Sequence, residues 1–226
     1  MRMHRIALPL LIAALVTTGL VFIAAGSASM HAELSDMADT EVMTMAEDAT
    51  ASEAEAEPAN PFGLTEPVAE FHERIRLKPF GLFATPETSP VPNDRFTGFH
   101  TAADVEFTDV AEEVPVSAIA DGTVEVARLA SGYGGVVVIR HTTTQGPLLA
   151  LYGHLDPESL PAVGDTVTQG QQIAQLGDTP YENGGTRKHL HFGIIRGEDV
   201  LLLGYVQHKE ELARWYDPLE FYPQTP

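Results

Sequence analysis

Alternating apolar and polar positions characterise the chain from Arg95 onward and predict a series of short β-strands. The apolar runs are rich in Val, Ile and Leu, and they are separated by glycine-containing turns. Short strands joined by such turns are typical of an antiparallel sheet folded into a sandwich or open barrel. We therefore predict a mainly β domain. The predicted strands are Val116–Ala120, Thr123–Leu129, Val136–His141, Pro147–His154 and His189–Ile195.

Two further segments carry a helical pattern. In Glu66–Arg76 the side chains of Val68, Phe71 and Ile75 fall on one stripe, which predicts an amphipathic helix ahead of the strands. Lys209–Tyr216 is predicted to form a second short helix near the end of the chain. Short helices should thus flank the β domain.

The start of the chain has the pattern of an export segment. Arg2 and Arg5 precede the uncharged run Ile6–Gly26, whose length of about 20 residues is enough to cross a bilayer. The run fits either a signal peptide that is cleaved or a signal anchor that stays in the membrane. Both alternatives leave the arginines inside and the remainder of the protein outside. We therefore expect a periplasmic or cell-surface protein.

An acidic tether is predicted between this segment and the folded part. Ala32–Asn60 contains nine acidic residues, no Lys or Arg and no aromatic residue, a composition that cannot bury enough surface to offset chain entropy. The expected organisation is an export segment (residues 1–29), a disordered tether (30–60), a lead-in helix and loop (61–94), and the main β domain (95–226).

Composition narrows the range of partners and reactive groups that the chain can have. With 32 acidic against 13 basic residues and a formal net charge of −19, the chain would be repelled by the phosphates of nucleic acid, so we expect no nucleic-acid partner. The absence of cysteine excludes disulfide scaffolds, thiol nucleophiles and iron–sulfur clusters. The histidines remain as candidates for metal binding or catalysis.

Three histidine-containing motifs stand out. On a strand, His189 and His191 face one side while Leu190 points to the core, so the two imidazoles can bind zinc or act as ligand and catalytic base. His100 and Asp104 project to the same side whether their segment is helical or extended, and both side-chain types are ordinary zinc ligands.

The third motif is His154, at the end of an apolar strand, with Tyr152 on the same face two residues earlier. It would add another imidazole beside a metal, whereas His141 is assigned a structural role. Three protein ligands and a water are the pattern of a catalytic zinc. Because the chain has no His-Glu-x-x-His helix, another histidine would have to accept the water proton.

At these residues the sequence resembles the lysostaphin-like (LytM-type) zinc metallopeptidases, which cut peptide cross-links in bacterial cell walls. The likeness extends from about Phe80 to Pro218 and is carried by the order of the three motifs. The motifs are His100-Thr-Ala-Ala-Asp104, Tyr152-Gly-His-Leu155 and His189-Leu-His-Phe192, and the stretches Val114–Val124, Gly132–Gly135 and Val163–Ile173 also match.

The resemblance implies specific roles for five residues. His100, Asp104 and His191 would be the Zn²⁺ ligands, and His189 would be the catalytic base. His154 would position water or stabilise the oxyanion. It also implies an antiparallel sandwich or open barrel of the lysostaphin-like (duplicated hybrid motif) type.

The implied function is a zinc-dependent endopeptidase that hydrolyses peptide cross-links of peptidoglycan outside the cytoplasmic membrane. Its partners would be peptidoglycan peptide stems and, if the N-terminal segment is retained, the membrane. The alternative is a catalytically silent wall-binding or activator domain for other cell-wall hydrolases. Such silent relatives typically lack ligands, whereas the ligand positions are intact here.

Overall fold

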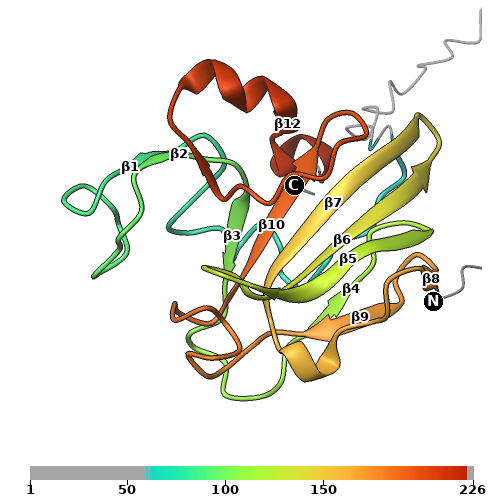
Figure 1. Cartoon of the computed structure of the whole chain (residues 1–226), viewed down its shortest axis with the longest axis horizontal. Helices are drawn as coiled ribbons and strands as arrows, with labels where there is room; N and C mark the ends of the chain where they lie inside the picture. Colours follow the sequence, from blue (N-terminus) through green and yellow to red (C-terminus); the bar gives the residue numbers. More distant parts are fainter. Residues whose placement is uncertain (1–59, 61, 223–226) are drawn as a thin grey trace, which may run out of the picture. The chain divides into compact units, whose positions relative to one another are not determined.

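The computed structural model describes residue 60 and residues 62–222, which build a mainly antiparallel β domain, as the strand pattern predicted (Figure 1). The predicted export segment and nearly all of the predicted tether lie outside the described residues. Over the described range, no helix has the length and apolar character needed to pass through a membrane.

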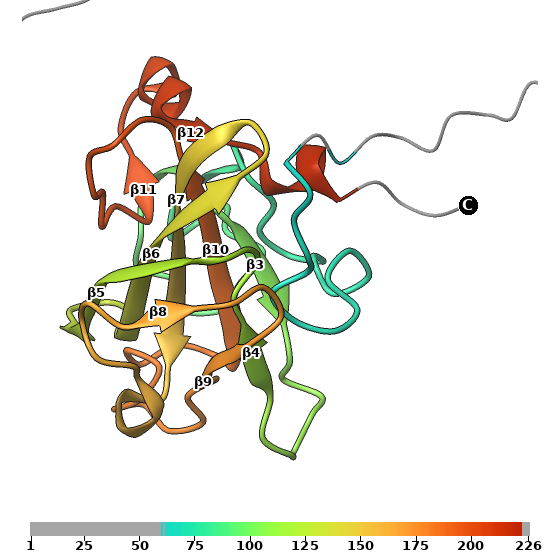
Figure 2. The ribbon, with the colours of Figure 1, turned by 90° about the vertical axis from the view of Figure 1, so that its right-hand side faces the viewer.

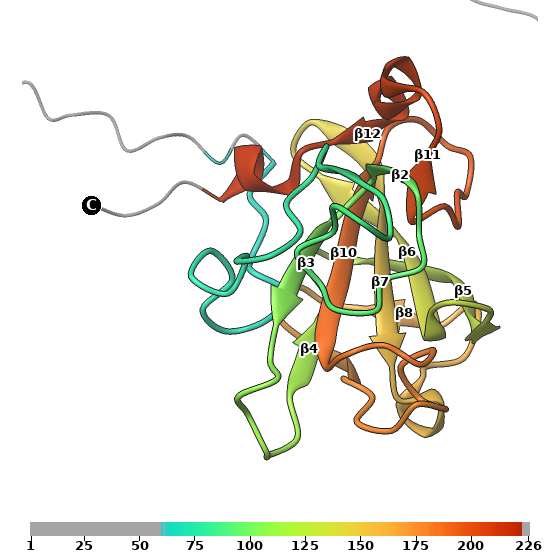
Figure 3. The same ribbon diagram turned by 90° about the vertical axis from the view of Figure 1, so that its left-hand side faces the viewer.

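Seven antiparallel strands form the largest sheet. Figure 3 shows β10 running between β3 and β7, so the predicted His-Leu-His-Phe strand is central to the sheet. The strands in order are β12 (Trp215–Tyr216), β10 (His189–Ile195), β7 (Gly146–Leu155), β6 (Gly134–Thr143), β5 (Gly122–Ala130) and β8 (Thr166–Val167), with β3 (Ala103–Glu106) also paired to β10.

Two small sheets accompany it, and β8 lies beside β5 at the far side of the large sheet (Figure 2). The first small sheet contains β1 (Phe83–Ala84), β2 (Gly98–His100) and β11 (Tyr205–Val206), and the second contains β4 (Pro115–Ser117) and β9 (Gln172–Gln175). Among the described residues the helices are short 3-10 turns: η1 (Pro157–Ser159), η2 (Lys209–Arg214) and η3 (Pro218–Phe221).

Four of the five predicted strands are confirmed as β5, β6, β7 and β10, within a few residues at each end. The fifth, Val116–Ala120, is shorter than predicted. Its strand β4 ends at Ser117, where the register with β9 is irregular. Beyond it, the Ala118 carbonyl accepts a hydrogen bond from Gly170 N–H in a loop rather than in a ladder.

The large sheet is buried on both faces, and alternation decides which side chain enters which core. On β10, Leu190, Phe192 and Ile194 pack into the larger hydrophobic core, as predicted for Leu190. The residues between them, His189 and His191, therefore face the opposite side. This second face carries the smaller apolar cluster around β6, β7, β11 and β12. The histidines thus lie beside a second core, fixed by the burial of their neighbours.

The helix predicted over Glu66–Arg76 does not form, and its residues make turns instead. Glu70 has a φ of 54°, which is left-handed and incompatible with a continuing α-helix. Nearby backbone groups also bond across to the β4 region, since Ser117 N–H donates to the Pro67 carbonyl at 2.8 Å. Val68 and Phe71 are nonetheless buried in the larger core, so the apolar stripe was informative about burial only.

The helix predicted over Lys209–Tyr216 is partly formed. Its first six residues make the 3-10 helix η2, but the last two form β12 and pair with Ile194 and Ile195 of β10. Burial of Trp215 against the second core accounts for this change from helix to strand.

A hydrogen-bonded chain inside the larger core fixes His141, in line with its predicted structural role. Ile119 N–H donates to Tyr152 Oη at 3.3 Å, and Tyr152 Oη–H donates to His141 Nε2 at 2.9 Å. His141 Nδ1–H in turn donates to the Ala120 carbonyl at 2.8 Å. Because both side chains are fully buried, each of these polar atoms depends on its neighbour for a partner.

Replacing Tyr152 by Phe should destabilise the domain. Loss of the hydroxyl would leave Ile119 N–H and His141 Nε2 buried without partners, at a cost of about 1–3 kcal/mol in the free energy of unfolding. Denaturant unfolding of wild type and Tyr152→Phe measures this cost. Tyr181→Phe, at a position 69% exposed, is the matched control and should stay within about 0.5 kcal/mol of wild type. Equal stability of all three proteins would contradict the network.

Acid should weaken the fold through His141. Burial lowers the pKa of His141 from 6.5 to about 4. Between these values the unfolded chain binds a proton that the folded chain does not, so the free energy of unfolding decreases as the pH falls from 6.5 to 4. A shift of this size corresponds to about 3 kcal/mol. In chelator-treated protein, the melting temperature of His141→Gln should depend less on pH over this window than the melting temperature of wild type. If the two melting temperatures changed with pH in parallel, His141 would not be the group responsible.

Candidate metal centre

Strand pairing brings His191 and Asp104 together. Asp104 lies on β3 directly opposite His191 on β10 in the antiparallel register. His100 ends β2, and a link of two residues leads to β3. The first of them, Thr101, anchors this link because its N–H donates to the Gly204 carbonyl at 3.1 Å. The chain can therefore turn from one small sheet to the large sheet within a few residues and keep His100 and Asp104 on the same side, as predicted.

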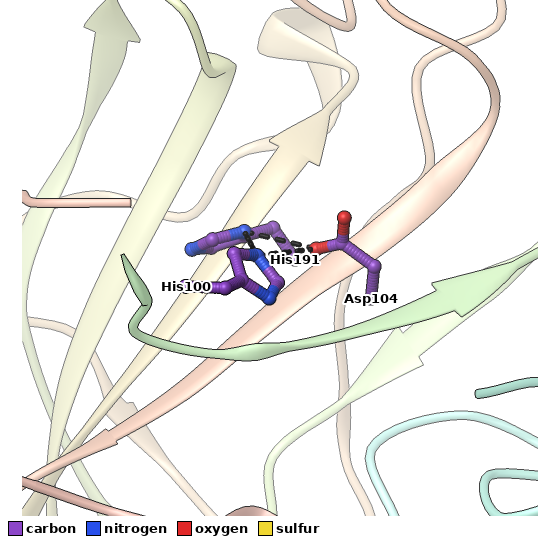
Figure 4. A group of neighbouring side chains, drawn as sticks. All are labelled: His100, Asp104 and His191. Carbon is purple, nitrogen blue, oxygen red and sulfur yellow. Dashed lines mark hydrogen bonds and ion pairs between the residues drawn. The ribbon is translucent and has the colours of Figure 1, made fainter. Parts of the chain in front are cut away.

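Three side-chain atoms from these residues form a compact triangle (Figure 4). His100 Nε2 lies 3.2 Å from His191 Nδ1 and 3.2 Å from Asp104 Oδ1. His191 Nδ1 and Asp104 Oδ1 are 3.0 Å apart. All three residues are at most 4% exposed. The trio that the sequence singled out thus converges at one buried point.

The geometry of the triangle fits a zinc ion. Ligand atoms about 2.0–2.1 Å from a tetrahedral zinc lie about 3.3 Å from one another, close to the three distances observed. His100 Nδ1–H donates to the Pro79 carbonyl at 3.2 Å, so the lone pair of Nε2 faces the carboxylate oxygen. Two acceptor atoms in contact need a cation or proton between them. The donor set could therefore hold a divalent metal.

Asp104 is set up to remain ionised. Burial alone would raise the pKa of this carboxyl group, but His100 and His189 hold it well below its usual range. The pKa of His191 is lowered to about 4, mainly by burial and further by the neighbouring histidines. An ionised carboxylate and neutral imidazoles are the forms that bind a metal.

His189 lies beside the triangle rather than in it. Its Nδ1–H donates to the Arg187 carbonyl at 2.8 Å, so Nε2 is the ring nitrogen that can exchange a proton. This Nε2 lies 3.3 Å from Asp104 Oδ2, the carboxylate oxygen that the triangle does not use. The imidazole is therefore held in one tautomer next to the metal-ligand candidates.

His154 reaches the same place through a distorted backbone. Its φ of 64° is left-handed, and the pairing of β6 with β7 shifts register nearby, between Gly135 and Val136. The ring lies 4.2 Å from that of His189, measured between centroids, and its Nδ1–H donates to the Asn183 carbonyl at 2.8 Å. Burial, followed by the charges of the nearby histidines, lowers the pKa of His154 well below its usual range.

The distortion also explains a wrong prediction about Tyr152. Strict alternation would put Tyr152 on the same face as His154, but Tyr152 lies in the larger core and bonds to His141. The left-handed residue turns His154 to the opposite face, where it meets His189. No alternation rule could have separated the two side chains without knowledge of this bulge.

Three residues near the site were missed in the sequence. Arg187 binds both Asp104 and Glu106, and Tyr133 packs its ring 5.3 Å from that of His191. The spacing Asp104-x-Glu106 on a strand and the position of Arg187 two residues before His189 were available signals, because residues two apart share a strand face. Tyr133 sits in a glycine-rich turn and fits over Gly153, where any side chain would collide with its ring.

The site opens into a cleft of about 820 Å³. Asp104, His154, His189 and His191 all contribute to its lining. Among the other lining residues, the ring of Phe96 stacks on Tyr205 and Lys78 forms an ion pair with Asp94. A cleft of this size beside a candidate metal centre can admit a peptide segment.

Comparison with known proteins finds a family match within the domain. Residues 98–201 match peptidase family M23. An uncharacterized metalloprotease of Haemophilus influenzae is 42% identical over 98 residues, and the murein hydrolase activator EnvC of Escherichia coli is 40% identical over 86 residues. These matches cover 42% and 38% of this chain but only 19% of either relative, so the chain matches about a fifth of each relative's length.

Among solved structures, lysostaphin of Staphylococcus simulans aligns over 70% of this chain and 53% of its own, with 22% sequence identity and a TM-score of 0.44. The family match includes His100, Asp104, His154, His189 and His191, the residues that the fold brings together. Residues 98–201 therefore carry a match to peptidase family M23, in agreement with the predicted resemblance to the lysostaphin-like (LytM-type) metallopeptidases.

Proposed function

We propose that this protein is a zinc-dependent endopeptidase that hydrolyses peptide cross-links of peptidoglycan outside the cytoplasmic membrane. The observation that carries the proposal is the buried triangle of His100 Nε2, Asp104 Oδ1 and His191 Nδ1, flanked by two further histidines at the floor of a cleft. Three protein ligands that leave a fourth position open are the pattern of a catalytic rather than a structural zinc.

Zinc held by these ligands would supply Lewis-acid polarisation of a carbonyl group and activation of water near neutral pH. The chain supplies the remaining functions. Asp104 brings negative charge through Oδ1, while its other oxygen is held by Arg187 at 3.0 Å, so the carboxylate has one fixed orientation. The burial of all three ligands strengthens these electrostatic interactions relative to water.

His189 is proposed as the general base. Its Nδ1–H is committed to the Arg187 carbonyl, so Nε2 is the atom that takes the proton from water. Once protonated, Nε2–H would face Asp104 Oδ2, 3.3 Å away, and the carboxylate would stabilise the positive imidazolium. The same proton can later be given to the leaving amine.

His154 is proposed to position the attacking water. Because Nδ1–H donates to the Asn183 carbonyl and the pKa is strongly lowered, the ring is neutral with a lone pair on Nε2. Such a nitrogen accepts a hydrogen bond from water. Of the two roles that the family resemblance implied for His154, this tautomer favours water positioning over donation to an oxyanion.

The proposed substrate and location rest on the relatives. Peptidase family M23 and the similarity to a murein hydrolase activator connect the domain with cell-wall hydrolysis. Peptidoglycan lies outside the cytoplasmic membrane, which agrees with the export segment predicted for residues 1–29. The alternative is a silent activator domain, favoured by the 40% identity to EnvC over 86 residues.

Digestion of purified peptidoglycan separates these two functions. Treated with the full chain and analysed by mass spectrometry, the wall should release peptides cut within cross-links. A chelator should abolish the release and added zinc should restore it. Activator function without cleavage would give no chelator-sensitive products, although another wall hydrolase added to the digest would become faster.

Removing one ligand should abolish zinc binding. His191→Ala takes away the nitrogen that lies within 3.2 Å of both other donor atoms, so two side chains remain, too few for a tight site. Zinc content after dialysis measures the effect. His208→Ala, an exposed histidine outside the cleft, is the matched control and should retain wild-type zinc content. Full zinc retention by His191→Ala would rule out the proposed centre.

Removing the proposed base should separate binding from turnover. His189→Ala should retain zinc, since its nitrogens are not part of the triangle, but should lose about 10²–10⁴-fold in kcat. Zinc content and the rate of cross-link cleavage are measured on the same preparation. A variant that keeps near wild-type turnover would show that another group takes the proton.

A further inference from the structure

A second acid lies beside the candidate metal centre. β3 places Asp104 opposite His191 and, two residues further on the same face, Glu106 opposite His189. Glu106 is only 5% exposed. Nothing in the proposed reaction uses this carboxylate, and a buried acid needs a specific partner to remain charged.

Arg187 is that partner, and it divides its hydrogen bonds unequally. Its Nε–H donates to Glu106 Oε2 at 2.7 Å and its Nη2–H donates to Glu106 Oε1 at 2.5 Å. The same Nη2 also donates to Asp104 Oδ2, at 3.0 Å. Glu106 therefore binds the guanidinium in a bidentate contact, while Asp104 accepts a single, longer hydrogen bond.

This division determines how Asp104 is presented. Oδ1 faces His100 and His191, whereas Oδ2 faces Arg187 and His189. One oxygen is thus free for a metal and the other is held in place, the arrangement that outer partners give to a ligating carboxylate. Without a competing acid, the planar fork of Arg187 would suit both oxygens of Asp104 equally well.

Charge leads to the same conclusion. A guanidinium beside a carboxylate that must bind a dication opposes metal binding, and the opposition is strong where water is largely excluded. The Arg187 side chain is 13% exposed, and the negative charge of Glu106 contacts it directly. Glu106 therefore offsets most of the cost that Arg187 imposes on a metal at Asp104.

We propose that Glu106 is a positioning residue of the metal centre, which binds Arg187 so that Asp104 Oδ1 stays available to zinc. This inference rests on the proposed zinc site. It assigns a role to a residue outside the five implicated in the reaction, and it predicts that Glu106 and Arg187 act as a coupled pair. Loss of Glu106 alone should harm zinc binding more than loss of both.

The test is a zinc competition titration of the full chain against a chromophoric chelator. Glu106→Gln should bind zinc about 10–100-fold more weakly than wild type. Without the negative charge of Glu106, the positive charge of Arg187 would act on Asp104 unopposed. The double variant Glu106→Gln/Arg187→Gln should recover most of that loss. Zinc affinity of Glu106→Gln equal to wild type, or a double variant as weak as the single one, would overturn the inference.

The Arg140–Glu125 pair provides the matched control. It is also a two-pronged contact between β6 and β5, and neither residue lines the cleft. Glu125→Gln should leave zinc affinity unchanged. Thermal unfolding of the metal-free proteins is recorded in parallel, and zinc affinities are corrected for the folded fraction. If Glu106 had a merely structural role, its loss would lower the melting temperature but leave the corrected zinc affinity unchanged.

Two further outcomes are decisive. If Glu106→Gln does not fold, Glu106→Asp replaces it, because the shorter acid keeps its charge but cannot reach both nitrogens of Arg187. It should also weaken zinc binding, and wild-type affinity would overturn the inference. If wild type itself binds no zinc, the proposed function fails and the inference fails with it. Normal zinc binding by both wild type and Glu106→Gln would overturn the inference alone.

Discussion

The antiparallel register of β3 against β10 is the constraint on which the site depends. It sets Asp104 opposite His191, two residues 87 positions apart in the chain, and Glu106 opposite His189. Because strand side chains alternate, a shift of β10 by one residue would move His189 and His191 to the other face, away from Asp104 and Glu106. The buried Leu190 and Phe192 prevent this shift, since it would bring them out of the larger core. Core packing thereby fixes the positions of the polar groups.

The polar groups in turn limit one another. Asp104 contacts two imidazoles through one oxygen, and Arg187 and a third imidazole through the other. Glu106 accepts two hydrogen bonds from Arg187, and Asp104 accepts one. Each histidine beside the triangle has one ring nitrogen committed to a backbone carbonyl, so its second nitrogen has a defined role. This pre-organisation is what the proposed hydrolysis would require of the protein.

Much of this arrangement could be predicted from the sequence. Alternation located the main strands and the face that His189 and His191 share, because local periodicity governs both. The helix over Glu66–Arg76 was predicted wrongly because Glu70 is left-handed and the carbonyls of Pro67 and Arg74 accept hydrogen bonds from β4 and β3 instead of from helical partners. The placement of Tyr152 failed at a left-handed residue, His154, and Arg187 was overlooked because its role depends on which acids the register places beside it.

The proposed mechanism depends on a single zinc ion that is shared by two imidazoles and one carboxylate. Zinc K-edge X-ray absorption of the zinc-loaded full chain tests it directly. It should show a tetrahedral ion with two imidazole ligands and oxygen donors at about 2.0–2.2 Å. An ion surrounded by oxygen alone, with no imidazole scattering, would contradict the claim, because His100 and His191 would then not bind the metal.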